Sequence, residues 1–194
     1  MQVSMELTGT TPLLLHSSAG VNPEHPGAQR IAALTATYKK TPAGRKEISR
    51  TEWHMGLYTD ESGTRLVVPC ANVFKCLVQA GKLSRQGTQV QRSLAFYDVD
   101  ADLEFDGADR PIDDLFDDPR YVDMRAVGIS RTSRIMRTRP RFLPWGLTIN
   151  GELFEDIMDP RDLTTIAEKA GRIEGLGDNR CNGFGRFTVK VTVA

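Results

Sequence analysis

The sequence predicts an α+β fold built on a ferredoxin-like β-α-β-β-α-β core. Three observations favour it: apolar residues alternate with polar ones near both ends of the chain, two segments carry apolar residues at helical spacing, and further alternating stretches lie between them. With 194 residues, the chain can bury one complete hydrophobic core but is short for two. We therefore expect a single domain over residues 1–194.

The first strand is predicted at the N-terminus, where Val3, Met5 and Leu7 alternate with polar residues. A loop rich in Gly, Pro, Asn and Ser follows. Apolar residues then recur near helical spacing across residues 28–56, with a break at Pro42. This segment is expected to be a mostly helical insertion into the core.

The central part of the chain predicts a strand, a helix and a second strand. "RLVVP" is a short β-rich run ended by Pro69, and the helix that follows places Phe74, Leu77, Val78 and Gly81 on one face. "SLAFYDVDADLEF" alternates acidic and apolar residues, which is typical of a strand with one buried and one solvated face.

Residues 121–150 are expected to form two or three strands around an arginine-rich turn. Pro140 and Pro144 disfavour a central strand, so a protruding β-hairpin, or thumb, is predicted here. The last helix is expected to begin after Asp159, a typical N-cap residue, with Pro160 at its first position. "FTVKVTV" alternates to give the final strand, which completes the β-α-β-β-α-β order once the insertion and the thumb are set aside.

The composition excludes several classes of protein. The chain is 40% hydrophobic and 26% charged, which is typical of a folded protein rather than a disordered one. No apolar run is long enough to span a membrane, and the N-terminal residues lack a signal-peptide pattern, so a cytoplasmic location is expected. Cys70, Cys76 and Cys181 are odd in number and lack zinc-site spacing, which favours reduced, mostly buried thiols.

The formal net charge of zero conceals two opposed blocks. Residues 98–118 contain ten acids and one base, whereas residues 125–141 contain six arginines and no acid. Such blocks indicate two differently charged surfaces. Clustered arginines beside aromatic residues are typical of nucleic-acid binding, because guanidinium groups bind phosphate in a bidentate fork. The predicted contacts to a nucleic-acid backbone are Arg125, Arg131, Arg134, Arg137, Arg139 and Arg141.

Ile135 and Met136 interrupt this arginine cluster with apolar side chains. An exposed apolar pair flanked by arginines could wedge between bases while the arginines hold phosphates. Alternatively, the arginines pair with the chain's own acidic block. The two interpretations merge if the acidic block of one copy meets the basic hairpin of the next, which would order a head-to-tail assembly.

The sequence offers few groups for catalysis. His16, His25 and His54 are the only histidines, and they lack metal-site spacing. "GLGDNRCNGFG" lacks the Gly-Lys-Ser/Thr ending of a P-loop, and it follows a helix rather than a strand, which excludes a dinucleotide-binding fingerprint. The acidic block lacks the spacing of a calcium-binding EF-hand. We expect neither a cofactor nor a metal ion.

Three stretches taken together resemble the RAMP superfamily, the ferredoxin-like proteins that process RNA or form the backbone of CRISPR effector complexes. They are "ELTGTTPLLLHS", "LVVPCANVFKCLVQA" and "GLGDNRCNGFGRFTV", in the order that the family shows them. The hairpin "SRIMRTRPRF" is similar to that of small, free-standing, phage-encoded members. The resemblance implies an RRM-like core, a hairpin thumb that reaches toward a neighbouring copy, and assembly along single-stranded nucleic acid.

The resemblance thus implies a non-catalytic protein of the host-cell cytoplasm that binds single-stranded DNA or RNA, forms a helical filament and serves phage DNA replication or recombination. The loop after the first strand lacks the Asp that target-cleaving members place there, and Lys75, a candidate contact, is displaced by one position from the family's helix lysine. The glycine loop would lie close to the bound strand. Its residues are Gly175, Gly177, Gly183 and Gly185, with Asn179, Arg180 and Arg186 as candidate contacts.

Two other functions stay open at this point. The first is a metal-independent endoribonuclease that uses His16 or His25 as general base, because processing members of the superfamily often use a histidine in this region. The second is an adaptor or inhibitor that presents the arginine hairpin to an acidic protein partner.

Overall fold

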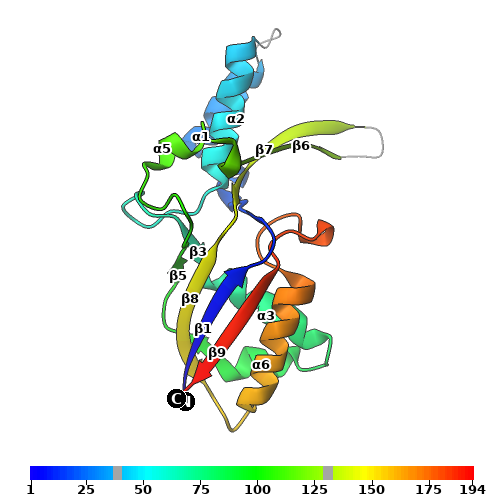
Figure 1. Cartoon of the computed structure of the whole chain (residues 1–194). Helices are drawn as coiled ribbons and strands as arrows, with labels where there is room; N and C mark the ends of the chain where they lie inside the picture. Colours follow the sequence, from blue (N-terminus) through cyan, green and yellow to red (C-terminus); the bar gives the residue numbers. More distant parts are fainter. Residues whose placement is uncertain (37–40, 129–132) are drawn as a thin grey trace. The chain divides into compact units, whose positions relative to one another are not determined.

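A computed structural model describes residues 1–36, 41–128 and 133–194 (Figure 1). These residues form two compact units. The core unit comprises Met1–Leu13, Thr59–Asp109 and Phe142–Ala194, and the hairpin unit comprises Leu14–Tyr58 and Arg110–Arg141. The expected helical insertion and most of the expected thumb therefore belong to the same unit. A single domain over the whole chain stays a prediction.

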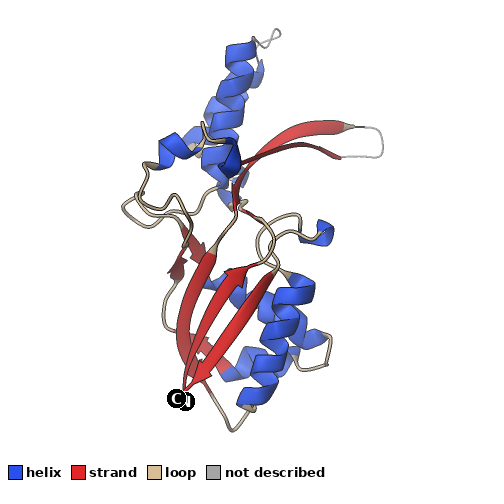
Figure 2. Cartoon of the chain, viewed as in Figure 1, coloured by secondary structure: helices blue, strands red, loops and turns tan. Residues whose placement is uncertain are grey.

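A four-stranded antiparallel sheet forms the base of the core unit, in the order β4-β8-β1-β9. Helices α3 and α6 lie on one face of this sheet (Figure 2). In chain order the six elements read β1-α3-β4-β8-α6-β9, which is the order of a ferredoxin-like core, so the predicted fold class is confirmed. Their bounds are β1 Gln2–Gly9, α3 Cys70–Lys82, β4 Leu94–Phe96, β8 Gly146–Leu153, α6 Pro160–Lys169 and β9 Phe187–Val193.

Side chains alternate between the two faces of the first core strand, as the sequence predicted. Val3, Met5 and Leu7 are buried, whereas Glu6 and Thr8 are exposed on the opposite face. Because successive side chains of a strand point to opposite faces, this alternation gives the sheet one face for the hydrophobic core and one face for solvent.

The two core helices also follow the sequence prediction. Helix α6 begins with Asp159 as its N-cap, and the Asp159 carboxylate accepts a hydrogen bond from the backbone N–H of Arg161 at 2.7 Å. Leu163 of α6 and Leu77 and Val78 of α3 are buried. The apolar stripes of both helices therefore close the core. The unit also contains α4 Gly87–Ser93, a π-helical turn Ala170–Glu174 and a 3-10 turn Arg180–Asn182.

The stretch "SLAFYDVDADLEF" does not form one strand, contrary to the prediction. Strand β4 ends at Phe96, and Val99 is 81% exposed. A separate strand, β5 (Asp100–Asp102), pairs with β3 (Val67–Pro69) in a two-stranded sheet. An alternating pattern shows that a strand has one buried face but not which strand it pairs with. Two short strands in different sheets therefore give the same pattern as one long strand.

Two helices occupy the segment for which a helical insertion was predicted. They are α1 (Pro26–Ala36) and α2 (Pro42–Gly56). Helix α2 begins at the predicted break, where the Thr41 hydroxyl accepts a hydrogen bond from the Gly44 backbone N–H at 3.0 Å. The Thr-Pro pair therefore acts as a start signal for the second helix.

Strands β6 (Val122–Gly128) and β7 (Arg134–Phe142) form the predicted antiparallel hairpin. The hairpin is shorter than the predicted segment 121–150, because β8 belongs to the core sheet. Strand β7 is also the middle strand of a sheet of order β2-β7-β6, although Pro140 argued against a central strand. Strand β2 (Leu13–Leu14) is only two residues long. The Pro140 carbonyl accepts a hydrogen bond from the Leu15 N–H at 3.1 Å, on the side of β2. Because the N–H and C=O of a strand residue point to the same side, the missing N–H of Pro140 costs no hydrogen bond with β6.

Trp53 anchors helix α2 within the hairpin unit. Its side chain is 0% exposed, and its indole N–H donates a hydrogen bond to the Tyr121 carbonyl at 2.8 Å. Its ring also meets Phe116 edge to face. An aromatic cluster therefore fixes the segment that leads into β6. The remaining elements of the unit are α5 Ile112–Leu115 and the 3-10 turns Ser18–Val21 and Pro119–Tyr121. Across the described ranges, no helix combines the length and the apolar character that crossing a membrane requires.

Candidate nucleic-acid interface

The pairing of β6 with β7 brings arginines onto one face of the hairpin. Arg125 lies directly opposite Arg137, and Asp123 lies directly opposite Arg139. Directly opposed residues share a face of a sheet, and so do residues two apart on one strand. Arg125, Arg137, Arg139 and Arg141 therefore form one row of side chains, which we call the arginine face.

Two carboxylates hold the arginine face in position. Asp123, which is 5% exposed, accepts a hydrogen bond from Arg125 Nε at 2.8 Å. Glu52 of α2 accepts hydrogen bonds from Arg137 Nη1 at 3.3 Å and from the Thr138 backbone N–H at 3.0 Å. Because like charges directly opposite each other repel, these carboxylates offset the repulsion between the two paired arginines.

Sequence reasoning missed both carboxylates. The spacing of Asp123 and Arg125 contained a signal, because residues two apart on a strand share a face. Glu52 gave no such signal, since it lies 86 residues from Thr138 in the chain. Neither carboxylate belongs to the acidic segment 98–118, so the pairing that the sequence offered as an alternative is not the one made by Arg125 and Arg137.

The hairpin keeps a positive charge despite Asp123. The described strands β6 and β7 contain five arginines and this one acid, a formal net charge of +4. Arg134 is exposed near the start of β7, and Arg141 Nη1 donates a hydrogen bond to the Arg120 carbonyl at 2.9 Å. Arg131 lies outside the described residues.

Replacing Glu52 by alanine is expected to loosen the hairpin from helix α2. The substitution removes the acceptor of the Thr138 N–H and the carboxylate partner of Arg137, which should lower the free energy of unfolding by about 1–3 kcal/mol. E52Q keeps an acceptor and should lose less. Urea unfolding and hydrogen exchange at the Thr138 amide measure the effect. The control is E47A, which breaks the exposed Arg30–Glu47 pair and should cost less than about 1 kcal/mol; equal losses would contradict the prediction.

The end of the acidic segment finds cationic partners within the hairpin unit. Asp117 contacts Lys46 and Arg50, and Asp118 contacts Arg110 and Arg120. Hydrogen bonds from Arg50 and Arg120, as the largest causes, hold the pKa of Asp117 and of Asp118 below the usual range of a carboxyl group. A neighbouring copy that used these two carboxylates would compete with their internal partners.

His54 is expected to make the stability of the hairpin unit depend on pH. Burial lowers the pKa of His54 most, Asp113 at 3.3 Å raises it, and Arg50 lowers it. Because the folded state has the lower pKa, the unfolded state binds more protons as pH falls below about 6.5, and stability should fall with it. Urea midpoints at about pH 7.5 and about pH 5.5 measure this fall. H54Q should remove most of it; an equal fall in H54Q would refute the assignment.

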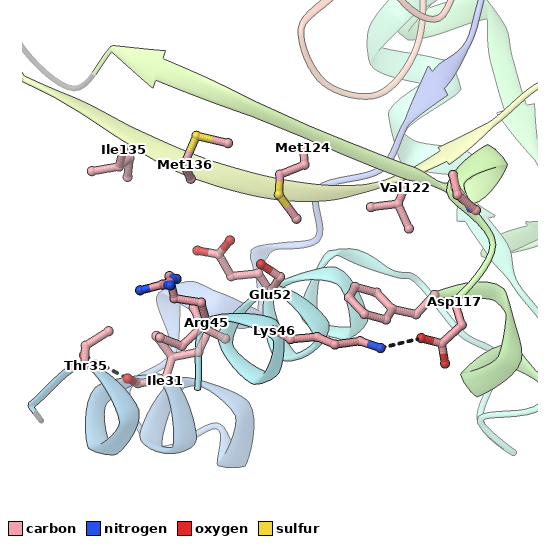
Figure 3. Close-up of a pocket in the computed structure, with 14 residues that line it drawn as sticks. Ile31, Thr35, Arg45, Lys46, Glu52, Asp117, Val122, Met124, Ile135 and Met136 are labelled. Carbon is pink, nitrogen blue, oxygen red and sulfur yellow. Dashed lines mark hydrogen bonds and ion pairs between the residues drawn. The ribbon is translucent and has the colours of Figure 1, made fainter. Parts of the chain in front are cut away.

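An apolar groove of about 1100 Å³ lies between the hairpin and helices α1 and α2 (Figure 3). Met124 and Met136 are exposed here, and the Lys46–Asp117 ion pair lies at the groove (Figure 3). Ile135 also borders it, so the groove is where the structure places the predicted apolar pair. The apolar lining comes from Ile31, Ile48, Phe116, Pro119, Val122, Met124, Ile135 and Met136.

The two candidate catalytic histidines have different surroundings. His25 Nδ1 accepts a hydrogen bond from the Gly27 backbone N–H at 3.1 Å, which gives this imidazole a structural contact at the start of α1. His16 is exposed and lines a second cavity, of about 340 Å³, together with Arg137 and Arg139. Within the described ranges, no three His, Cys, Asp or Glu side chains gather in a way that could hold a metal ion.

The glycine loop of the core unit closes on the protein's own backbone. Gly175, Gly177, Gly183 and Gly185 all have positive φ. At Gly185 the approaching backbone is that of Leu176: the Leu176 N–H donates to the Gly185 carbonyl at 2.9 Å, and a Cβ on Gly185 would stand 1.8 Å from the Leu176 carbonyl oxygen. Gly183 differs, because nothing lies within 4 Å of its Cβ position. At Gly185, therefore, the backbone that approaches closely is that of Leu176 and not, as the sequence had suggested, that of a nucleic-acid strand.

The other predicted contacts of the core unit are partly engaged. The Arg186 backbone N–H donates to the Thr11 hydroxyl at 2.8 Å, and Arg186 Nη2 donates to the Arg180 carbonyl at 3.2 Å. Asn179 has a left-handed backbone, with φ of 58°. Lys75 is exposed on α3. These residues belong to the core unit, whereas the arginine face belongs to the hairpin unit.

Within the described strands β1, β8 and β9, the solvent face of the core sheet offers no aromatic side chain on which a base could stack. RRM domains stack bases on aromatic side chains of this face. Here the described residues of β1, β8 and β9 place mainly hydroxyl, amide and charged side chains on it, and none of them is aromatic. They are Gln2, Ser4, Glu6, Thr8, Thr148, Asn150, Glu152, Thr188, Lys190 and Thr192. The RRM-like strand order therefore does not bring RRM-type base stacking with it.

Of three comparisons with known proteins, the one with solved structures found a similar fold. No protein-family model matches the chain, and no curated protein matches it. Among solved structures, one similar chain belongs to the type III-B Cmr-beta complex, determined by cryo-EM with cognate target RNA bound. The TM-score is 0.53 at 11% sequence identity, over 98% of this chain and 60% of the Cmr-beta chain. This chain thus spans less than two thirds of its neighbour's length, and the likeness shows a shared fold.

Proposed function

We propose that this protein binds single-stranded DNA or RNA through the arginine face of its hairpin. The observation that carries the proposal is the strand register, which sets Arg125 opposite Arg137 and places Arg139 beside them. The side chains of Arg125 and Arg137 are held by carboxylates yet stay 43% and 44% exposed. Guanidinium groups held in this way lose little conformational freedom when they meet phosphate.

The apolar groove gives the same hairpin a surface for bases. Met124 and Met136 alternate with Arg125 and Arg137, so they lie on the other face of the hairpin, where they are exposed. A strand that leaves its phosphates on the arginine face and passes around the hairpin can cover these apolar side chains with unstacked bases. The Cmr-beta chain that is similar in fold was solved with target RNA bound, which supports a nucleic acid as the ligand class.

Binding at several ionic strengths tests this proposal. Fluorescently labelled single-stranded DNA and RNA of equal length and sequence would be titrated with protein while salt is raised. Log affinity should fall linearly with log salt, by about 0.7 for each phosphate contacted, so four engaged arginines give a slope near −3. An affinity that hardly changes with salt would overturn the proposal, and a difference between the two strands would identify the preferred nucleic acid.

Copies of the protein are further proposed to assemble head to tail along the strand into a helical filament, in phage DNA replication or recombination. The formal net charge of zero leaves acidic groups to balance the basic hairpin. Among them, Asp114 is exposed, so its carboxylate can face a neighbouring copy. Electron microscopy on long single strands should show filaments whose length follows that of the strand; isolated particles would contradict assembly. Unchanged filaments with D114R would discard this contact.

The proposal describes a non-catalytic protein, and one observation favours a second candidate. His16 lines one cavity with Arg137 and Arg139. An imidazole can act as a general base and guanidinium groups can stabilise negative charge, which is the combination that cleaves RNA without a metal ion. Labelled single-stranded RNA incubated with the protein and a chelator separates the two functions. An intact strand agrees with a binder, whereas cleavage that H16A abolishes would establish an endoribonuclease.

A further inference from the structure

Strand β9 is an edge strand of the core sheet, so one of its sides has no partner strand in the described residues. In the described part of the chain, β9 pairs with β1 on one side and has no strand on the other. Gln2 and Ala194 exchange both backbone hydrogen bonds, each at 3.0 Å. Because hydrogen-bonded and non-hydrogen-bonded pairs alternate in an antiparallel ladder, the backbone N–H and C=O groups of Val189, Val191 and Val193 point away from β1.

The beginning of this edge is covered by the protein itself. A Cβ on Gly171 would stand 2.1 Å from the Phe187 carbonyl oxygen, so the helical turn Ala170–Glu174 lies directly against Phe187. The free part of the edge therefore runs from Val189 to Val193.

Natural sheets protect their edges, and the free part of this edge, from Val189 to Val193 of the described strand β9, lacks the usual devices. The opposite edge strand, β4, is three residues long, whereas β9 is seven residues long and contains no proline. The one charged residue of β9, Lys190, pairs with Glu6 on the solvent face at 3.2 Å. The valines of the free edge are only half-buried, so apolar surface accompanies the unpaired backbone groups. An edge of this kind is a template for another strand.

We propose that β9 pairs antiparallel with β9 of a second copy of this chain, so that the two core sheets join into one continuous sheet. A two-fold axis at Val191 sets Val191 opposite itself and Val189 opposite Val193 of the second copy. This register uses only the free part of the edge and forms about six backbone hydrogen bonds. A register centred on Val189 would need the edge position of Phe187, which is already covered.

Side chains are compatible with the register centred on Val191. The valines of both copies meet on the face that carries the hydrophobic core. On the solvent face, Lys190 lies opposite Thr192 of the second copy, so no like charges oppose each other. The occupant is therefore a second copy of the same strand, because this edge is complementary to itself in backbone groups, in apolar surface and in charge.

Removing one outward N–H tests the pairing directly. V191P deletes a donor that points away from β1, so the β1–β9 ladder keeps its hydrogen bonds while the second copy is blocked. Protein freed of nucleic acid would be examined by sedimentation equilibrium. Wild type should dimerise with rising concentration, with slower hydrogen exchange at Val189, Val191 and Val193, and V191P should stay monomeric. A wild type that stays monomeric, with exchange at these amides independent of concentration, would overturn the proposal.

Charge changes at Thr192 test the register without altering the backbone. Thr192 is exposed, so its variants should fold even if V191P does not. In T192K, the new lysine of each copy lies opposite Lys190 of the other copy, which gives two repulsive pairs and should raise the dimer Kd about tenfold at low salt. T192E places a carboxylate opposite each Lys190 and should lower the Kd by a similar factor. T188K and T188E lie on the same face outside the valine register and should change the Kd little. A dimer that ignores both Thr192 variants would overturn the pairing, whatever the outcome of the nucleic-acid experiments.

Discussion

Replacing Arg134 by alanine together with Arg137 by glutamine should weaken single-strand binding about 10- to 100-fold at low salt. Both side chains are exposed on β7, Arg137 on the arginine face and Arg134 on the opposite face near the start of the strand. Each substitution is expected to remove a charge-assisted contact to phosphate. Glutamine at 137 still offers an N–H to Glu52, so the hairpin keeps its contact with α2. Fluorescence anisotropy with labelled single strands measures the loss of affinity.

The salt dependence distinguishes lost phosphate contacts from a general loss of structure. Removing two contacts should reduce the slope of log affinity against log salt by about 1.4. R92A/R172A removes two exposed arginines from the core unit and serves as the charge-matched control. If the control weakened binding as much as R134A/R137Q, the ligand would be responding to overall charge, and the arginines of the hairpin would not be its site.

The fold class could be predicted because its main elements carry local signals. Asp159 and Pro160 define the start of α6 through capping chemistry that involves only neighbouring residues. Val3, Met5 and Leu7 alternate because one face of β1 is buried. The pairing partners of short strands carry no local signal, which is why β4 and β5 were predicted as one strand although they belong to different sheets.

The residue composition of the hairpin predicted where the candidate site lies but not how its side chains are arranged. Six arginines without an acid identified the hairpin, but the row of Arg125, Arg137 and Arg139 depends on the register of β6 and β7. Register in turn depends on a turn and on packing, neither of which is encoded in spacing alone. The contact of Glu52 with Thr138 bridges α2 and β7, so only the folded chain shows it.

The glycine loop gives the second large expected effect, because two of its glycines differ in the space around them. G185A should lower the free energy of unfolding of the core unit by about 3–5 kcal/mol, within the range of severe steric and backbone mechanisms. Gly185 has φ of 68°, and an added Cβ would stand 1.8 Å from the Leu176 carbonyl oxygen. The strain would also disturb the hydrogen bond from the Gly185 N–H to the Pro12 carbonyl at 2.8 Å. Urea unfolding followed by circular dichroism measures the loss.

G183A is the matched control, since it adds the same methyl group two residues away. Gly183 has φ of 84° but open space around its Cβ position, so only the left-handed backbone is strained, at a cost of about 1–2 kcal/mol. Equal losses in the two variants would mean that the approach of Leu176 to Gly185 carries no energetic weight. Because G183A should leave the core folded, it is also the variant that can report on nucleic-acid contact at this loop. Weaker single-strand binding by folded G183A would assign the loop a role in binding, whereas unchanged binding would leave its glycines to the geometry of the chain.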